Sequence, residues 1–294
     1  MNIQLVVPTK GCVNNCPFCC SKMHDCLYEN KFDAIEIEKR IKYAVMHKID
    51  TCVLTGTGEV LQNTKFLEKL YIIFKKLGHP FPNIELQTTG VMLFDAEHYI
   101  SGESGQEINV YHNLTLLKKL RVNTISLSIS DIFNNENNNH IIGVPDKLKF
   151  KLPEMVHSLK MFGFNVRLSL NMLNTLDGIE PERIFKYAKT LGADQISFKR
   201  MYYNNELEYA QNDWIRENMC QERTINDIKD YVLQKGRHIY TLLFGAKVYS
   251  VWGLSTVIVD DCMAVNNTDI MRYIILRENG KLYCHWDDEG SLIF

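Results

Sequence analysis

Short apolar runs alternate with amphipathic segments along the first two thirds of the 294-residue chain. The runs are rich in Val, Ile, Leu and Thr, as β-strands are, whereas the segments between them repeat apolar residues every three or four positions, as helices do. Strands that alternate with helices pair in parallel through right-handed crossovers, so the pattern predicts an α/β fold. The expected strands are Ile3–Val7, Thr51–Leu54, Asn83–Gln87, Thr124–Ile129, Asn165–Leu170 and Gln195–Phe198. The expected helices are Ala34–His47, Thr64–Leu77, Leu114–Leu120, Pro153–Phe162 and Pro181–Leu191.

The rhythm of the sequence changes towards the C-terminus. A long polar helical region is followed by β-type runs at Tyr249–Asp260 and Arg272–Leu276. The Asn279-Gly280 dipeptide after the second run is typical of a tight hairpin turn. We therefore expect a first domain over residues 1–205 and a C-terminal cap of mixed α+β structure over residues 206–294.

Composition limits the classes of protein to which the chain can belong. With 46% hydrophobic and 11% aromatic residues it can bury a sizeable core, which excludes general disorder. Its 33 basic and 35 acidic side chains argue against a broad basic face for nucleic acid. No apolar run approaches the roughly 18 residues of a membrane span, and the segment MNIQLVVPTKGC lacks the basic-then-apolar layout of a signal peptide. We expect a cytoplasmic protein without a membrane partner or a strong nucleic-acid signal, and an exposed loop at Asn134–Asn139.

Nine cysteines are distributed unevenly, five of them within fifteen residues and four far apart. The five are Cys12, Cys16, Cys19, Cys20 and Cys26, and the four are Cys52, Cys220, Cys262 and Cys284. In a chain without an export signal, a tight cysteine group indicates metal binding or catalysis rather than disulfides. The first three have C-x3-C-x2-C spacing directly after the first expected strand, so their thiolates can converge on one soft metal centre.

Two kinds of metal centre suit three thiolates on one loop. A structural zinc ion needs a fourth protein ligand, which Cys20, Cys26 or His24 could supply. A cube-type iron–sulfur cluster held by three thiolates instead leaves one iron free for a substrate or cofactor. In parallel αβ barrels the loops after the strands build the active site, so the position of this loop favours a catalytic centre.

The segment Cys12–Cys19, with Phe18 before its last cysteine, resembles the signature of radical S-adenosylmethionine (SAM) enzymes. In that family C-x3-C-x-aromatic-C follows the first strand of a partial (β/α)6 TIM-type barrel. The segment Thr55–Glu59 after the second strand is similar to the Gly-Gly-Glu motif that grips the methionine amine of SAM. The resemblance implies a [4Fe–4S] cluster on Cys12, Cys16 and Cys19. It also implies SAM as cofactor, bound by Phe18, Gly56, Thr57, Gly58 and Glu59.

Three later strand ends are also similar to SAM-contacting segments of the family. They are Ser126–Asp131, Asn165–Asn171 and Gln195–Arg200. The resemblance implies that the side chains facing the cofactor are Ser128, Ser130, Arg167, Asn171 and Phe198. A structural role stays open for these residues, because polar side chains can also line a barrel interior, and for Glu59, because carboxylates suit helix N-termini.

The C-terminal cysteines resemble a shortened twitch/SPASM-like module that carries an auxiliary iron–sulfur cluster. Cys262 and Cys284 would be ligands, although the spacing between Gly280 and Cys284 is one residue short of the usual pattern. Cys220 is a candidate third ligand, or a catalytic hydrogen-atom donor that quenches the substrate radical. A cap without a cluster, in which these cysteines are structural, is the alternative.

The resemblance implies an enzyme that cleaves SAM reductively and abstracts hydrogen from its substrate. The electron would come from a donor such as flavodoxin or ferredoxin. Our preferred substrate is a peptide or peptidyl side chain, because of the extra cysteines in the cap and the lack of overall basicity. The alternatives are a nucleoside or RNA base, or a small metabolite. A zinc-stabilised interaction protein is the hypothesis without catalysis.

Overall fold

A computed structural model describes most of the chain. The described residues are 1–23, 33–94, 98–101, 107–110, 112–201, 203, 209–242, 245–259, 271–286 and 288–294. His24, Cys26 and Cys262, which the sequence analysis singles out, lie outside these ranges.

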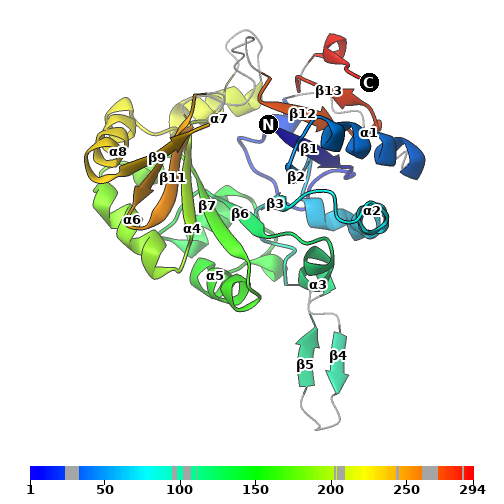
Figure 1. Cartoon of the computed structure of the whole chain (residues 1–294). Helices are drawn as coiled ribbons and strands as arrows, with labels where there is room; N and C mark the ends of the chain where they lie inside the picture. Colours follow the sequence, from blue (N-terminus) through cyan, green and yellow to red (C-terminus); the bar gives the residue numbers. More distant parts are fainter. Residues whose placement is uncertain are drawn as a thin grey trace.

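A mainly parallel sheet of eleven strands, counted over the described residues, forms the centre of the fold (Figure 1). Its order is β13-β12-β1-β2-β3-β6-β7-β8-β11-β10-β9, so β13 and β9 are its two edges. The six expected strands are β1 (Asn2–Val7), β2 (Thr51–Gly56), β3 (Asn83–Thr88), β6 (Thr124–Ile129), β7 (Asn165–Asn171) and β8 (Gln195–Lys199). Each lies within two residues of its predicted bounds, which confirms the α/β prediction. Strands β4 (His98–Ser101) and β5 (Glu107–Val110), which we did not predict, pair as a separate antiparallel hairpin.

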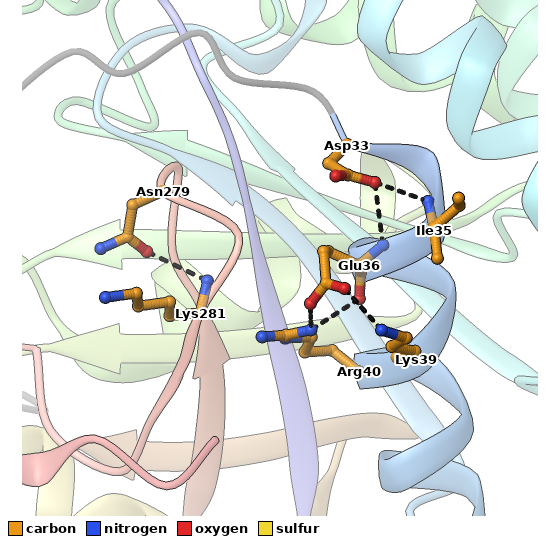
Figure 2. Close-up of polar contacts among 7 residues, drawn as sticks. All are labelled: Asp33, Ile35, Glu36, Lys39, Arg40, Asn279 and Lys281. Carbon is orange, nitrogen blue, oxygen red and sulfur yellow. Dashed lines mark hydrogen bonds and ion pairs between the residues drawn. The ribbon is translucent and has the colours of Figure 1, made fainter.

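Helices are arranged around the outside of the curved sheet (Figure 1). The five expected helices are α1 (Ala34–Met46), α2 (Thr64–Lys76), α3 (His112–Lys119), α5 (Leu152–Met161) and α6 (Pro181–Thr190). Three more are α4 (Asn135–Ile141), α7 (Ala210–Asn218) and α8 (Glu222–Lys235). Local capping shows why α1 begins where it does. Asp33 accepts hydrogen bonds from the backbone N–H groups of Ile35 and Glu36, at 2.9 and 3.1 Å (Figure 2).

The two faces of each strand serve different layers. Apolar side chains on the outer face pack against the helices: Phe198 of β8 and Phe185 of α6 are both fully buried, with ring centroids 5.7 Å apart. Because side chains alternate along a strand, the neighbours of Phe198 on β8, Ser197 and Lys199, face the interior of the curved sheet. The main hydrophobic core therefore lies between the sheet and the helices, and the interior carries polar side chains.

The Asn-rich segment is a helix, which corrects the prediction of an exposed loop at Asn134–Asn139. Asn134 caps α4 by accepting a hydrogen bond from the N–H of Asn137 at 3.1 Å. Asn138 and Asn139 are 1% and 3% exposed. Asn138 Oδ1 accepts from the N–H of Ser130 at 2.8 Å, and Asn139 donates to the carbonyl of Phe150 at 2.8 Å. Burial of these amides is tolerated because each forms hydrogen bonds with backbone groups of a neighbouring loop.

The C-terminal third adds strands to both edges of the sheet. Strands β10 (Lys247–Val251) and β11 (Leu254–Val259) form a hairpin that begins two residues before the predicted β-type run, and β11 pairs in parallel with β8. Strand β9 (Arg237–Thr241) pairs with β10, and β12 (Tyr273–Leu276) pairs in parallel with β1. The domain boundary at residue 205 stays a prediction, although residues on both sides of it share one sheet.

The predicted turn at Asn279-Gly280 joins β12 to β13 (Leu282–Tyr283), and the two strands are antiparallel. Gly280 adopts φ 76°, a conformation that glycine reaches without strain. Asn279 Oδ1 accepts a hydrogen bond from the N–H of Lys281 at 3.1 Å (Figure 2). Both observations confirm the hairpin predicted from the dipeptide.

Candidate active site

The loops after β1 and β2 leave the sheet side by side. Val7 and Gly56, the last residues of these parallel strands, are paired in register. A Cβ atom at Gly58 would lie 2.4 Å from the carbonyl oxygen of Gly11 and 2.5 Å from Oγ1 of Thr9. Only glycine allows such close approach, so Gly58 brings Thr55–Glu59 directly against the cysteine loop. Gly56 contributes less, because its Cβ would lie 3.0 Å from the carbonyl oxygen of Val7.

The three motif cysteines lie near one another at this end of the sheet. Burial, together with the nearby charges of Cys19 and Cys12, raises the pKa of the Cys16 thiol to about 12. Burial likewise raises the pKa of Cys12, although backbone groups of Asn14 and Glu59 hydrogen-bond its thiolate and lower it. Crowded thiols of this kind ionise when a positive metal centre neutralises them. In the described part of the chain no three Cys, His, Asp or Glu side chains converge as the ligands of a single ion do.

Helix α4 supports the cysteine loop from one side. The carbonyl of Ile142, at the end of the helix, accepts hydrogen bonds from the N–H of Asn15 at 3.2 Å and from Sγ of Cys16 at 3.4 Å. A Cβ atom at Gly143 would lie 2.9 to 3.0 Å from atoms of Asn15. The Asn-rich segment therefore holds the loop between Cys12 and Cys16 in place.

Glu59 is 3% exposed and accepts three hydrogen bonds from the end of β3. The Thr88 hydroxyl donates to Oε1 at 2.6 Å, and the Thr89 hydroxyl and N–H donate to Oε2 at 3.0 and 3.1 Å. No basic side chain among the described residues forms an ion pair with Glu59. Burial accordingly raises the pKa of its carboxyl group. A buried carboxylate without a cation suits a ligand that brings a positive charge.

Two polar groups beside Glu59 also lack partners. Asn14 Nδ2 donates to the Thr89 hydroxyl at 2.7 Å, but Asn14 Oδ1 and the Thr9 hydroxyl are buried without a hydrogen-bond partner among the described residues. Buried polar atoms are normally paired, so these atoms point to a polar ligand. The site therefore fits a group with an ammonium and further hydrogen-bonding atoms, as the amino-acid end of SAM has.

Sequence reasoning missed Asn14, Thr88 and Thr89. The available signal was the Thr88-Thr89-Gly90 segment that directly follows the third strand. Polar residues at the carboxyl end of a parallel strand are frequent site residues.

Ser128, Ser130 and Asn171 come together at the ends of β6 and β7. Asn171 Nδ2 donates to Oγ of Ser130 at 3.3 Å and to Oγ of Ser128 at 3.5 Å. Phe18 is half-buried, and its ring centroid lies 5.5 Å from that of Trp214 in α7. The roles of these four residues as SAM contacts stay predictions.

Arg167 and Phe198 are not brought to this site. Arg167 is four residues before Asn171, roughly 13 Å lower along β7. There its guanidinium pairs with Glu85 and donates to Gln195 Oε1 at 2.7 Å. Phe198 is on the outer face of β8, against Phe185. Contact of these two side chains with SAM stays a prediction, although the structure places Arg167 at a lower level of its strand than Asn171 and Phe198 on the outer face of its strand.

Cys220 and Cys284, the C-terminal cysteines that the structure describes, each lie near a backbone carbonyl. Cys220 is 2% exposed, and its thiol donates to the carbonyl of Leu173 at 2.8 Å. Burial raises its pKa to about 12, with a further contribution from the charge of Asp177. Cys284 Sγ lies 3.5 Å from the carbonyl oxygen of Ser291. An auxiliary cluster on Cys262 and Cys284 stays a prediction.

Cys220→Ala separates the two roles considered for this residue. Because the thiol is packed and bonded to a backbone carbonyl, we expect the variant to lose about 1–2 kcal/mol of stability with unchanged product formation. Chemical denaturation and product analysis measure the two effects. Loss of product with normal SAM cleavage would instead identify Cys220 as the hydrogen-atom donor.

The turn between β12 and β13 contacts the glycine motif. Thr57 Oγ1 donates to Oε1 of Glu278 at 2.6 Å, and burial raises the pKa of that carboxyl. Thr57 is the only residue between Gly56 and Gly58, so this bond ties the C-terminal hairpin to the loop that presents Glu59.

Removing this bond is expected to weaken SAM binding. Glu278→Ala should lower the affinity about fivefold, the effect of one ordinary hydrogen bond, because the loop loses its anchor. Glu278→Gln keeps an acceptor oxygen and should keep the affinity. SAM titration of the cluster-loaded protein measures both. Equal affinities of Glu278→Ala and the unmodified chain would contradict the anchoring role.

The family model of the Radical SAM superfamily matches residues 6–191. This chain belongs to the radical SAM superfamily. The matched segment contains the cysteine loop, the Thr55–Glu59 loop, four of the six predicted strands and the last two residues of β1. Members of this superfamily are enzymes that use a [4Fe–4S] cluster and SAM.

Solved structures with the same fold include anSMEcpe with bound AdoMet and the Cp18Cys peptide. It matches with a TM-score of 0.61 at 14% identity, over 98% of this chain and 74% of that chain. Methylornithine synthase (PylB) matches with a TM-score of 0.50 at 15% identity, over 92% of this chain and 77% of that one. This chain spans 53% of the coproporphyrinogen III oxidase (HemN) chain from Escherichia coli, with a TM-score of 0.45 at 16% identity and 80% of this chain covered. No curated protein matches the sequence.

Proposed function

We propose that this radical SAM enzyme modifies a peptide or a peptidyl side chain. In this proposal Cys12, Cys16 and Cys19 hold the [4Fe–4S] cluster, and Glu59 holds the methionine amine of SAM. The observation that carries these assignments is the buried Glu59 carboxylate, which has no basic partner among the described residues and lies against the cysteine loop.

The residues around Glu59 have separate tasks in this arrangement. When bound, the cluster supplies the electron that cleaves SAM reductively and so begins hydrogen abstraction from the substrate. Thr88 and Thr89 orient the Glu59 carboxylate, which offers its negative charge to the ammonium. Asn14 Oδ1 offers an acceptor beside it. The missing side chain of Gly58 lets the two loops touch, which excludes water between them.

The peptide substrate is supported by the likeness to anSMEcpe, whose structure holds a peptide. At 14% identity that likeness concerns the fold, so the substrate needs its own test. Part of the C-terminal third extends the sheet beside β1, and its hairpin contacts Thr57. In this proposal the cap lies close enough to the Thr55–Glu59 loop to affect which substrate reaches it. In the described part of the chain, no helix is long and apolar enough to cross a membrane.

Isotope transfer distinguishes the substrate classes. The cluster-loaded protein, dithionite and SAM are mixed anaerobically with one of three fully deuterated fractions: peptides, nucleosides with RNA fragments, or small metabolites. We expect deuterium to enter 5′-deoxyadenosine from the peptide fraction alone. Transfer from either of the other fractions in place of the peptides would overturn the peptide assignment.

Metal analysis of the same preparation tests the cofactor assignment. Iron and sulfide near four per chain are expected for the catalytic cluster alone, and near eight with an auxiliary cluster. About one zinc per chain without iron would contradict the cluster assignment.

A further inference from the structure

Lys22 follows the motif cysteines and holds their loop at two points. It is the last residue of the short 3₁₀-helix η1 (Cys20–Lys22), and its N–H donates to the carbonyl of Cys19 at 3.1 Å. Its ammonium Nζ reaches back along the loop and donates to the carbonyl of Cys16 at 3.1 Å and to Oδ1 of Asn15 at 2.6 Å. One residue therefore contacts the backbone of both Cys16 and Cys19.

The segments that hold Lys22 are themselves anchored. The next residue, Met23, is 2% exposed and donates its N–H to the carbonyl of Cys20 at 2.9 Å. On the other side, the N–H of Asn15 donates to the carbonyl of Ile142 at the end of α4. Lys22 is exposed, but an ammonium held in this way loses less of its effect to side-chain motion than a free surface lysine does.

The chain also places negative charge at this loop. Cysteines that bind a metal centre are thiolates, and the Thr55–Glu59 loop, which carries the Glu59 carboxylate, touches the cysteine loop where Gly58 meets Gly11. Both partners of the Lys22 ammonium are neutral, and no ion pair among the described residues includes Lys22. Lys22 therefore brings a positive charge, not neutralised by such a pair, to a site rich in negative charge.

We propose that Lys22 is a positioning residue that makes reduction of the iron–sulfur cluster easier. The inference rests on the proposed function, since it requires the cluster on Cys12, Cys16 and Cys19. Reduction takes one electron from the external donor and adds one negative charge at the site, without loss of a group. A cation held at the loop stabilises the added charge, so it raises the reduction potential.

Redox titration of the cluster-loaded full chain, without SAM or substrate, tests the proposal. The protein is equilibrated anaerobically with dithionite and mediators at a series of potentials, and EPR spectroscopy measures the reduced fraction. Lys22→Met removes the charge and the donor, Lys22→Gln removes the charge but keeps an N–H donor, and Lys22→Arg keeps both. The control, Lys119→Met, removes an exposed lysine from α3 and changes the net charge equally.

Lys22→Met and Lys22→Gln are expected to lower the equilibrium constant for reduction about fivefold, which corresponds to about 40 mV for a one-electron couple. Lys22→Arg and Lys119→Met should keep the potential of the unmodified chain. At about 1 M salt the difference between Lys22→Gln and the unmodified chain should become smaller, because ions screen an exposed charge. A purely structural role would not give this dependence on charge and salt.

An unchanged potential in both neutral variants would overturn the proposal, as would an equal shift in Lys22→Arg or in Lys119→Met. Loss of iron from both neutral variants would leave Lys22 with a structural role only and would also overturn it.

The titration needs no turnover, so its failure is distinct from failure of the proposed function. A protein that forms 5′-deoxyadenosine while its neutral variants keep the same potential would count against this inference alone. The expected shifts in a protein that forms no 5′-deoxyadenosine would count against the proposed function alone.

Discussion

Glu59→Gln is expected to lower the affinity for SAM about a hundredfold, the upper range for a charge-assisted hydrogen bond inside a protein. Glutamine keeps the shape of the side chain, and its amide can still accept from Thr88. It loses the negative charge that no basic residue in the described part of the chain now neutralises. SAM titration of the cluster-loaded protein measures the affinity, and the yield of 5′-deoxyadenosine should fall with it.

The matched control is Glu154→Gln on α5, which changes the net charge equally and whose exposed carboxylate pairs with Lys151. It should bind SAM as the unmodified chain does. Iron content should be the same in both variants, because neither removes a thiol. Undiminished SAM affinity of Glu59→Gln would show that the buried carboxylate is structural.

Cys16→Ala is expected to remove most of the iron from the protein and all SAM cleavage. Three thiolates already leave one iron of the cluster without a protein ligand, so two cannot retain it securely. Cys20→Ala is a stringent control, because Cys20 is exposed and immediately follows Cys19. That variant should keep about four irons per chain and its activity. Equal loss of iron in both variants would assign the cluster to a different set of ligands.

The parts of the fold that depend on local pattern were predictable from sequence. The strand ending at Val7 and the helix beginning at Ala34 were predicted because apolar periodicity acts over a few positions. Asn134–Asn139 was misjudged for the opposite reason. Its amide side chains are buried and hydrogen-bond to backbone groups of Ser130 and Phe150. These contacts with other segments cannot be inferred from the local residue pattern.

The candidate site divides in the same way. Cys12, Cys16, Cys19 and Glu59 stand in motifs with specific spacing, so the sequence identified them together. Arg167 and Asn171 share one face of β7, but only the second lies at the carboxyl end of the strand. Alternation predicts the face of a strand residue, whereas its height relative to the cofactor depends on how the strands assemble.

The sequence by itself determined the order of strands and helices, the metal-binding loop and the family to which these motifs point. Only the tertiary structure decided that Thr88, Thr89 and Asn14 surround Glu59 and that Glu278 anchors Thr57. The physical reason is the range of the interactions. Periodicity and motif spacing are properties of neighbouring residues, but a site is formed by side chains that are far apart in the chain and meet only when the sheet assembles.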